Sequence, residues 1–159
     1  MKAEERILRL MIEKSLKLSV AESCTGGLIA SRITDIAGSS EYFDAGMVTY
    51  SNAAKIRFLG VPEELLIRHG AVSRETAESM AQGVRRATGS HVGLSVTGIA
   101  GPGGGSDLKP VGTVFIGISW EEGVLVKGFL FKGDRKEIRQ QASDAALQMV
   151  IDHLEVESV

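Results

Sequence analysis

The sequence predicts an α/β fold, a three-layer α/β/α sandwich built around a mixed sheet. Segments with apolar residues at helical spacing alternate along the chain with short runs rich in β-branched residues. Near the C-terminus two such runs follow each other closely, which predicts a C-terminal antiparallel hairpin, and a long terminal helix comes after them. The 159 residues, 43% of them hydrophobic, suit a single domain over residues 1–159.

The first half of the chain predicts two strands and the helices around them. Residues of roughly 3–16 have helical spacing, and a short strand over 18–22 leads into a glycine-containing turn at 23–27. A helical period resumes over 28–36 and stops at the glycine that follows. Residues 42–50 are rich in aromatic and β-branched side chains, as is typical of a strand.

The second half of the chain predicts short helices, then one longer helix, then the hairpin. Two short helices are expected after the second strand, the first capped by Ser51 or Asn52 and the next beginning at the Val61-Pro62 step. A longer helix is expected over 73–89. The remaining elements are three strands and the final helix, at residues 91–97, 111–120, 124–131 and from Asp134-Arg135 onward.

Three strand ends are the expected location of a functional site. Ligands of open α/β sheets bind where the carboxyl ends of the strands meet the loops. Here these ends carry Ser23, Tyr50 and the Thr97-Gly98 turn. We expect the three to form one site if their strands run parallel and lie side by side.

Composition excludes several classes of partner. A formal charge of −2 and a pI near 5.9 show no basic excess, so no nucleic acid is expected. The first 20 residues contain no apolar run suited to a signal peptide or a membrane span, which predicts a cytoplasmic protein without a membrane partner. The one cysteine, Cys24, and three scattered histidines predict neither a disulfide nor a metal site. The expected partner is a small molecule, and no cofactor is expected.

The turn that begins Ser23-Cys24 has more than one interpretation. The glycines at a helix start let backbone N–H groups point at an anion, either a phosphate or an oxyanion. Ser23 would then be a nucleophile held where these groups converge, as in a nucleophile elbow, although the GxSxG pattern is absent. Alternatively, Ser23 only caps the helix and the glycines allow tight packing.

A nucleophilic serine needs a base, and no histidine is expected near Ser23. Lys55 is the remaining candidate, because burial lowers the pKa of a lysine towards neutrality. The Tyr50 hydroxyl would relay the proton or hold the ammonium. The alternative is that Lys55 is an ordinary solvated residue and Tyr50 a boundary residue.

Two further segments suit a ligand. The glycine-rich run that starts at Thr97-Gly98 and includes Gly101 allows close approach to the backbone, and it lacks the Walker A pattern, which disfavours nucleoside triphosphate hydrolysis. Arg135 and Arg139 lie four residues apart at a helix start, where guanidinium groups suit a phosphate or a carboxylate. A solvated helix start with surface ion pairs would explain the same two residues.

Five motifs together resemble the C-terminal domain family of the competence/damage-inducible protein CinA, whose stand-alone members are nicotinamide-nucleotide amidases. The motifs are AESCTGG at 21–27, DIAGSSEYFDAGMVTYSNAAK at 35–55, HGAVS at 69–73, TGIAGPGGGSDLKPVGTV at 97–114 and GDR at 133–135. The resemblance covers nearly the whole chain.

This resemblance implies hydrolysis of the carboxamide of nicotinamide mononucleotide to nicotinic acid mononucleotide and ammonia, a step of pyridine nucleotide recycling, without a metal. It implies Ser23 as nucleophile, with Lys55 and Tyr50 managing the proton. Backbone N–H groups around Thr25 to Gly27 would hold the oxyanion. Thr97, Gly98 and the following loop would line the nucleotide, and Arg135 or Arg139 would meet its phosphate. The residues expected to bind substrate are Thr25, Gly26, Gly27, Thr97, Gly98, Gly101, Arg135 and Arg139.

Two other functions remain open from the sequence. The chain would be an amidase of a different carboxamide, or a non-catalytic nucleotide-binding or regulatory module of the same fold. A degraded catalytic triad would mark such a module, and all three residues are present. An apolar hairpin at a sheet edge further predicts a homo-oligomer, most simply a dimer.

Overall fold

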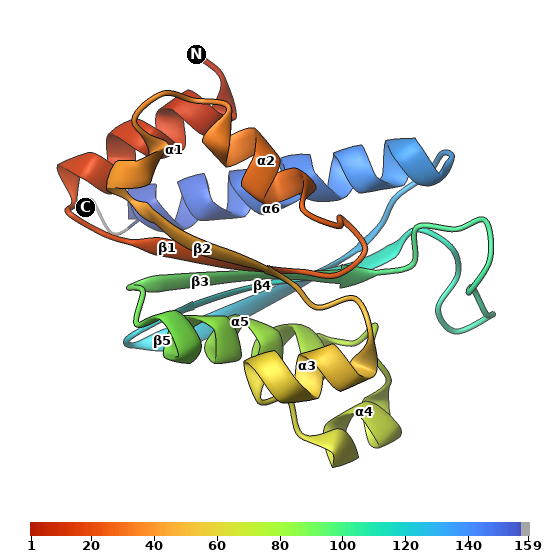
Figure 1. The fold of residues 1–159 in the computed structure, drawn as a ribbon. Helices are drawn as coiled ribbons and strands as arrows, with labels where there is room; N and C mark the ends of the chain where they lie inside the picture. The colour runs from red at the N-terminus through yellow and green to blue at the C-terminus, as the bar shows by residue number, and fades with distance from the viewer. Residues whose placement is uncertain (157–159) are drawn as a thin grey trace.

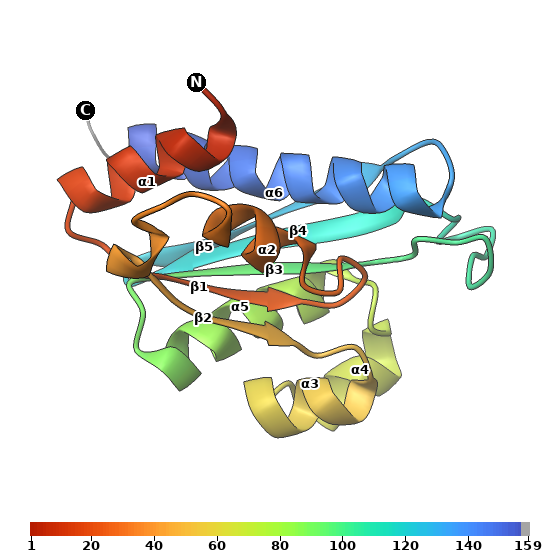
Figure 2. The ribbon, with the colours of Figure 1, turned by 45° about the horizontal axis from the view of Figure 1, so that its top comes forward.

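A computed structural model describes residues 1–156 as helices on both faces of a five-stranded sheet (Figure 1). The strands are β1 (Leu18–Glu22), β2 (Phe43–Val48), β3 (Val92–Gly98), β4 (Thr113–Trp120) and β5 (Gly123–Leu130). One face is covered by α1 (Ala3–Glu13), α2 (Leu28–Thr34) and α6 (Arg135–Val156). The other is covered by α3 (Asn52–Leu59), α4 (Glu63–His69) and α5 (Arg74–Thr88), as Figure 2 also shows.

The sheet is mixed, in the order β2-β1-β3-β4-β5. Strand β1 pairs in parallel with both β2 and β3, while β3–β4 and β4–β5 are antiparallel. The predicted three-layer fold, its hairpin and its terminal helix are therefore confirmed. Glu22 at the end of β1 stands opposite Val48 of β2 and Val96 of β3, so the three strands end at one edge of the sheet. We call this edge the carboxyl edge.

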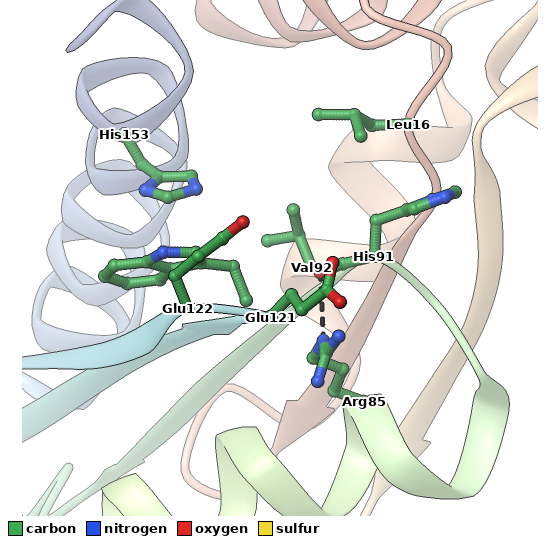
Figure 3. A pocket seen from close by; sticks show the side chains of 8 residues that line it. Leu16, Arg85, His91, Val92, Glu121, Glu122 and His153 are labelled. Atoms are coloured by element: carbon green, nitrogen blue, oxygen red, sulfur yellow. Dashed lines mark hydrogen bonds between the residues drawn. The ribbon is translucent and has the colours of Figure 1, made fainter. Parts of the chain in front are cut away.

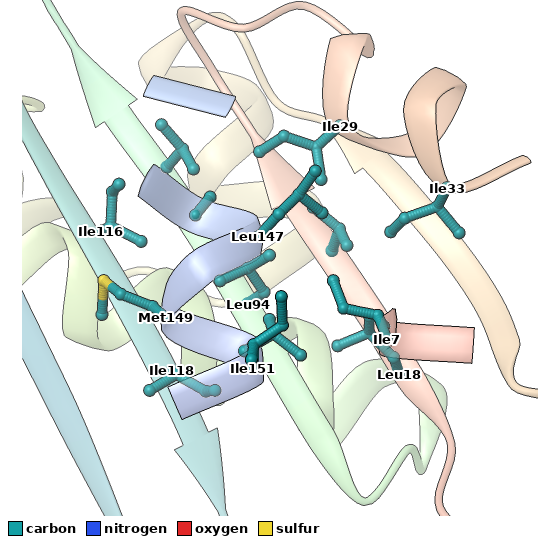
Figure 4. Packing of buried hydrophobic residues seen from close by; sticks show 14 of the residues in the cluster. Ile7, Leu18, Ile29, Ile33, Leu94, Ile116, Ile118, Leu147, Met149 and Ile151 are labelled. Carbon is teal, nitrogen blue, oxygen red and sulfur yellow. The ribbon is translucent and has the colours of Figure 1, made fainter. Parts of the chain in front are cut away.

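Alternation along β1 separates two apolar clusters. Val20 belongs to the larger cluster between the sheet and helices α1, α2 and α6, and Ala21 belongs to the smaller cluster on the α3–α5 face. The next residue, Glu22, points to the α2 side, where it contacts the start of that helix. Figure 4 shows the larger cluster, which includes Ile7, Leu18, Ile29, Ile33, Leu94, Ile116, Ile118, Leu147, Met149 and Ile151.

Two predicted element ends differ from those in the structure, each for a physical reason. The first helix ends at Glu13 instead of near residue 16, because Ser15 takes a left-handed backbone conformation with φ 55° and turns the chain into β1. Strand β2 ends at Val48 instead of residue 50, because Thr49 and Tyr50 turn their carbonyl groups towards Lys55. The other predicted boundaries agree with the structure within two residues.

The helices differ in length, and α6 is the longest at 22 residues. None of those within residues 1–156 combines the length and the apolar character needed to cross a membrane.

Candidate active site

A buried serine–lysine pair lies at the carboxyl edge. Ser23, the first residue after β1, is 8% exposed, and Lys55 of α3 is 1% exposed. The Lys55 Nζ lies 2.9 Å from the Ser23 Oγ, and it also donates to the carbonyl groups of Thr49 at 2.7 Å and Tyr50 at 3.1 Å. The nitrogen therefore has one acceptor for each of the three N–H bonds that a protonated lysine carries.

The start of α3 aims Lys55 back at the strand end. The Ser51 hydroxyl caps this helix by accepting a hydrogen bond from the Ala54 N–H at 3.0 Å, which fixes the predicted cap on Ser51. Gly60 ends the helix after eight residues in a left-handed conformation. Because only three residues separate β2 from α3, the Lys55 side chain stays within reach of the end of β1.

Burial makes Lys55 a usable base. Loss of hydration disfavours its ammonium form and lowers its pKa from 10.5 to about 8, although charge interaction with Cys24 acts in the opposite direction. At pH 7, Lys55 is then neutral in about one tenth of the molecules. Burial raises the pKa of the neighbouring Cys24 thiol to about 11, so the thiolate needed for attack is scarce. The hydroxyl of Ser23, and not this thiol, has an adjacent base.

The turn after Ser23 is closed by internal hydrogen bonds. Gly26 and Gly27 take left-handed φ values of 58° and 104°, which side chains other than glycine rarely adopt. The Gly26 N–H donates to the Ser23 carbonyl at 3.1 Å, and the Gly27 N–H donates to the Glu22 carboxylate at 3.2 Å. These two N–H groups are engaged inside the protein, contrary to the prediction that they receive an oxyanion. In the part of the chain that the structure describes, the N–H groups of Cys24 and Thr25 have no such acceptor.

Arg139 of α6 binds the backbone of the same turn. Its Nε donates to the Cys24 carbonyl at 3.1 Å and its terminal nitrogen to the Thr25 carbonyl at 2.9 Å. The sequence predicts that Arg135 or Arg139 meets a phosphate, and the structure shows Arg139 in contact with the backbone of this turn. Sequence periodicity placed this arginine near a helix start but gave no partner for it.

Arg135 and Tyr50 form the rim of the site. Arg135 donates to the Gly101 carbonyl at 2.7 Å and to the Tyr50 hydroxyl at 3.0 Å. The Tyr50 side chain is 59% exposed, and its backbone carbonyl, not its hydroxyl, holds Lys55. The prediction that the Tyr50 hydroxyl relays the proton is therefore not matched by this geometry, because the hydroxyl is turned to Arg135.

The third strand end is held by internal contacts. The Thr97 hydroxyl donates to the Ala71 carbonyl at 2.8 Å and so anchors the loop before α5. A Cβ on Gly98 would lie 2.9 Å from the Thr113 carbonyl oxygen, and one on Gly101 would lie 2.5 Å from the Val111 side chain. Close packing of the loop accounts for these two glycines without a ligand.

Sequence reasoning missed two residues of this edge. Glu22 and Thr49 are both buried, and Glu22 caps α2. A carboxylate at the end of a buried strand was the available signal for Glu22, because buried acids are rare unless paired. Nothing in the sequence distinguished Thr49. Its hydroxyl and that of Thr25 are buried without a hydrogen-bond partner within residues 1–156, as is typical of groups that face a water or a ligand.

A cleft of about 400 Å³ lies at the opposite, amino edge of the sheet (Figure 3). The Trp120 and His153 rings contact each other there at a tilt of 44°, with centroids 4.4 Å apart, and Glu121 and Glu122 also line the cleft. The residues that line this cleft include no serine, threonine or cysteine, so it offers no hydroxyl or thiol nucleophile. Residues 1–156 also contain no group of three or more His, Cys, Asp or Glu side chains suited to a metal ion.

The chain is similar to proteins of one known family. The family model for the CinA C-terminal domain matches residues 1–154. A CinA-like protein of Geotalea daltonii is 60% identical over 130 residues, covering 82% of this chain and 32% of that protein. A CinA-like protein of Geobacter sulfurreducens is 56% identical over 141 residues, covering 89% and 34%. The chain thus spans about a third of the length of these curated relatives.

Solved structures with the same fold cover nearly the whole chain. The competence/damage inducible protein CihA from Agrobacterium tumefaciens has a TM-score of 0.89 and 45% identity, with 98% of this chain and 97% of that chain covered. The competence damage-inducible protein A from Klebsiella pneumoniae has a TM-score of 0.93 and 33% identity, with 96% and 95% covered.

Proposed function

The chain belongs to the CinA C-terminal domain family, and on this premise we propose that it is an amidohydrolase that converts nicotinamide mononucleotide to nicotinic acid mononucleotide and ammonia. The observation that carries the proposal is the buried contact of 2.9 Å between Lys55 Nζ and Ser23 Oγ. The choice of substrate rests on the resemblance of the motifs around these residues to those of the family's amidases.

In the first step Lys55 activates Ser23. Neutral lysine carries two N–H bonds and one lone pair, and the carbonyls of Thr49 and Tyr50 are available for the two N–H bonds. The lone pair then faces Ser23 Oγ, whose proton moves to Lys55 as the oxygen attacks the carboxamide carbon. The resulting ammonium has all three of its N–H bonds satisfied.

In the second step the tetrahedral intermediate collapses. Its oxyanion is held by the N–H groups of Cys24 and Thr25, and the former is the residue after the nucleophile, as in a nucleophile elbow. Lys55 returns the proton to the amide nitrogen, the carbon–nitrogen bond breaks and ammonia leaves. A water molecule, deprotonated by Lys55, then attacks the carbonyl carbon of the Ser23 ester. The bond to Ser23 Oγ breaks, Lys55 returns the proton to that oxygen, and the acid is released.

The rim of the site supplies the contact for the phosphate. Arg135 donates two hydrogen bonds within the protein, and a guanidinium carries five N–H donors. It lies exposed at the same edge as Ser23, where a charged group of the substrate would arrive. Arg139 also donates two hydrogen bonds, but its partners are the Cys24 and Thr25 carbonyls and it is less exposed than Arg135, so we assign it to holding the turn.

Ammonia release from nicotinamide mononucleotide by the purified, chelator-treated protein tests this function. We expect Ser23→Ala to abolish turnover while the variant still binds the nucleotide. Cys24→Ala is the matched control, because it changes the next side chain, and we expect it to keep turnover. Turnover by Ser23→Ala would overturn the mechanism.

The substrate is tested by the same assay with other carboxamides. Nicotinamide riboside lacks the phosphate, and nicotinamide lacks the sugar as well, so we expect both to be poor substrates. A wild-type protein that prefers one of them is an amidase of a different carboxamide. A wild-type protein that binds the mononucleotide but releases no ammonia is a binding module.

A further inference from the structure

The carboxylate of Glu22 is completely buried beneath the turn at residues 23–27. Its Oε1 accepts hydrogen bonds from the N–H groups of Gly27 at 3.2 Å and Ile29 at 3.0 Å, and its Oε2 accepts one from Ala30 at 3.0 Å. The first N–H groups of a helix have no partner within the helix. The residue at the cap position, Gly27, has no side chain, so Glu22 satisfies the start of α2 from the neighbouring strand.

The same contacts close the loop that contains Ser23. Glu22 directly precedes Ser23, so its side chain ties the end of β1 to the start of α2 across the turn. On the other side, the Ser23 N–H donates to the Val96 carbonyl of β3 at 3.0 Å. A turn with two adjacent left-handed glycines has a large conformational freedom of its own, and these contacts restrict it.

We propose that Glu22 is a positioning residue for Ser23. Its carboxylate holds the turn so that Ser23 Oγ stays at hydrogen-bond distance from Lys55 and the N–H groups of Cys24 and Thr25 stay free for the oxyanion. The inference rests on the proposed function, since it assigns Glu22 a part in the same reaction. It also explains a buried acid that would otherwise be costly to desolvate.

The competing explanation is that Glu22 only stabilises α2. Arg32 provides the comparison, because it anchors the same helix at a place away from Ser23. Its guanidinium donates to Glu4 at 2.7 Å, Asp144 at 2.6 Å and Ser143 at 2.7 Å. A variant of Arg32 loosens α2 without touching the turn.

The experiment compares Glu22→Gln with Arg32→Met. The glutamine has nearly the same shape, but its amide donors meet N–H donors of the helix start, which opens the cap. The measurements are kcat and KM for nicotinamide mononucleotide, thermal unfolding, and the rate at which a fluorophosphonate probe modifies Ser23. The probe reports the position of the nucleophile and does not require turnover of the nucleotide.

We expect Glu22→Gln to lower both kcat and the rate of Ser23 modification about tenfold or more, with KM changed less than about threefold. The dependence of modification on pH should keep its midpoint near the pKa of Lys55. Arg32→Met should unfold at a lower temperature but keep the wild-type rate of modification. A folded Glu22→Gln protein that reacts at the wild-type rate, or two variants that lose activity in step with stability, would overturn the proposal.

If Glu22→Gln does not fold, Glu22→Asp takes its place. The aspartate keeps the charge but is one methylene shorter, so we expect a folded protein with the same selective loss of modification rate. Wild-type protein that reacts with the probe but releases no ammonia overturns the proposed substrate, and the variants still decide the role of Glu22. Wild-type protein that neither reacts nor turns over overturns both.

Discussion

The two edges of the sheet differ in how they hold their polar groups. At the carboxyl edge Glu22, Ser23 and Lys55 are buried, and each of these three side chains has specific partners at hydrogen-bond distance. At the amino edge the cleft of about 400 Å³ is flanked by Glu121 and Glu122, which are exposed to solvent. The buried, hydrogen-bonded groups and this solvent-exposed cleft thus lie at opposite edges of one sheet.

The two edges differ in how far their ionisable groups are buried, and burial changes the pKa of such a group. A desolvated lysine has a lowered pKa and can take a proton, whereas an exposed acid retains ordinary hydration. Desolvating a lysine is unfavourable for stability, and the protein offsets it with the carbonyls of Thr49 and Tyr50. We therefore base the proposed site on the buried pair and not on the volume of the cleft.

Removing Lys55, the proposed base, should have the largest effect of the variants that test this contrast. We expect Lys55→Met to lower kcat by about 10² to 10⁴, the range that a general base contributes. Lys55→Arg should be equally inactive, because a guanidinium does not give up its proton at neutral pH. Lys127→Met, at an exposed lysine of β5, is the control, and ammonia release is the measurement. Activity in Lys55→Met within tenfold of wild type would contradict the role of Lys55.

The pH profile should show the buried lysine directly. Because the proposed mechanism requires the neutral amine of Lys55, kcat/KM should rise about tenfold per pH unit below about 8 and level off above it. The free energy of unfolding should also depend on the protonation of Lys55. Between the folded pKa near 8 and the unfolded value near 10.5, the unfolded chain binds more protons, so wild type should gain stability relative to Lys55→Met as pH rises through this window. A flat stability difference would mean that Lys55 has an ordinary pKa.

Variants of Arg139 and Arg135 should change different kinetic constants. Arg139 holds the Cys24 and Thr25 carbonyls, so Arg139→Lys, which has no planar fork, should lower kcat about tenfold with little change in KM. Arg135→Lys should instead raise KM for the mononucleotide and leave kcat near wild type, because this residue lies at the exposed rim. Equal effects of both variants on KM would place both guanidinium groups at the phosphate.

The layers and the location of the site could be predicted from the sequence because they depend on local patterns. Periodicity identified the strands, and the rule for carboxyl ends placed Ser23, Tyr50 and Thr97 at one edge, where the structure has them. The burial of Lys55 beside Ser23 agrees with the expected base. Each of these inferences needed only spacing along the chain and the fold class.

What the sequence could not predict depends on contacts between distant residues. Arg139 and Cys24 are 115 positions apart, so no local pattern shows that this arginine contacts the Cys24 carbonyl. The Tyr50 hydroxyl turns to Arg135, 85 residues away, and its carbonyl takes the place next to Lys55. The role of Glu22 depends on the path of the turn, which two left-handed glycines determine.

The smallest effect is expected at the amino edge, and it sharpens the comparison most. Val92 lines the cleft there and Gly98 ends β3 at the carboxyl edge, six residues or about 20 Å apart along an extended strand. This distance exceeds the Debye length of about 8 Å at physiological ionic strength, so removing two exposed charges should leave the pKa of Lys55 unchanged. We therefore expect Glu121→Gln with Glu122→Gln to change kcat and KM less than about twofold. A change of tenfold in either constant would mean that the sheet couples its two edges, and the amino-edge cleft would then be part of the functional machinery.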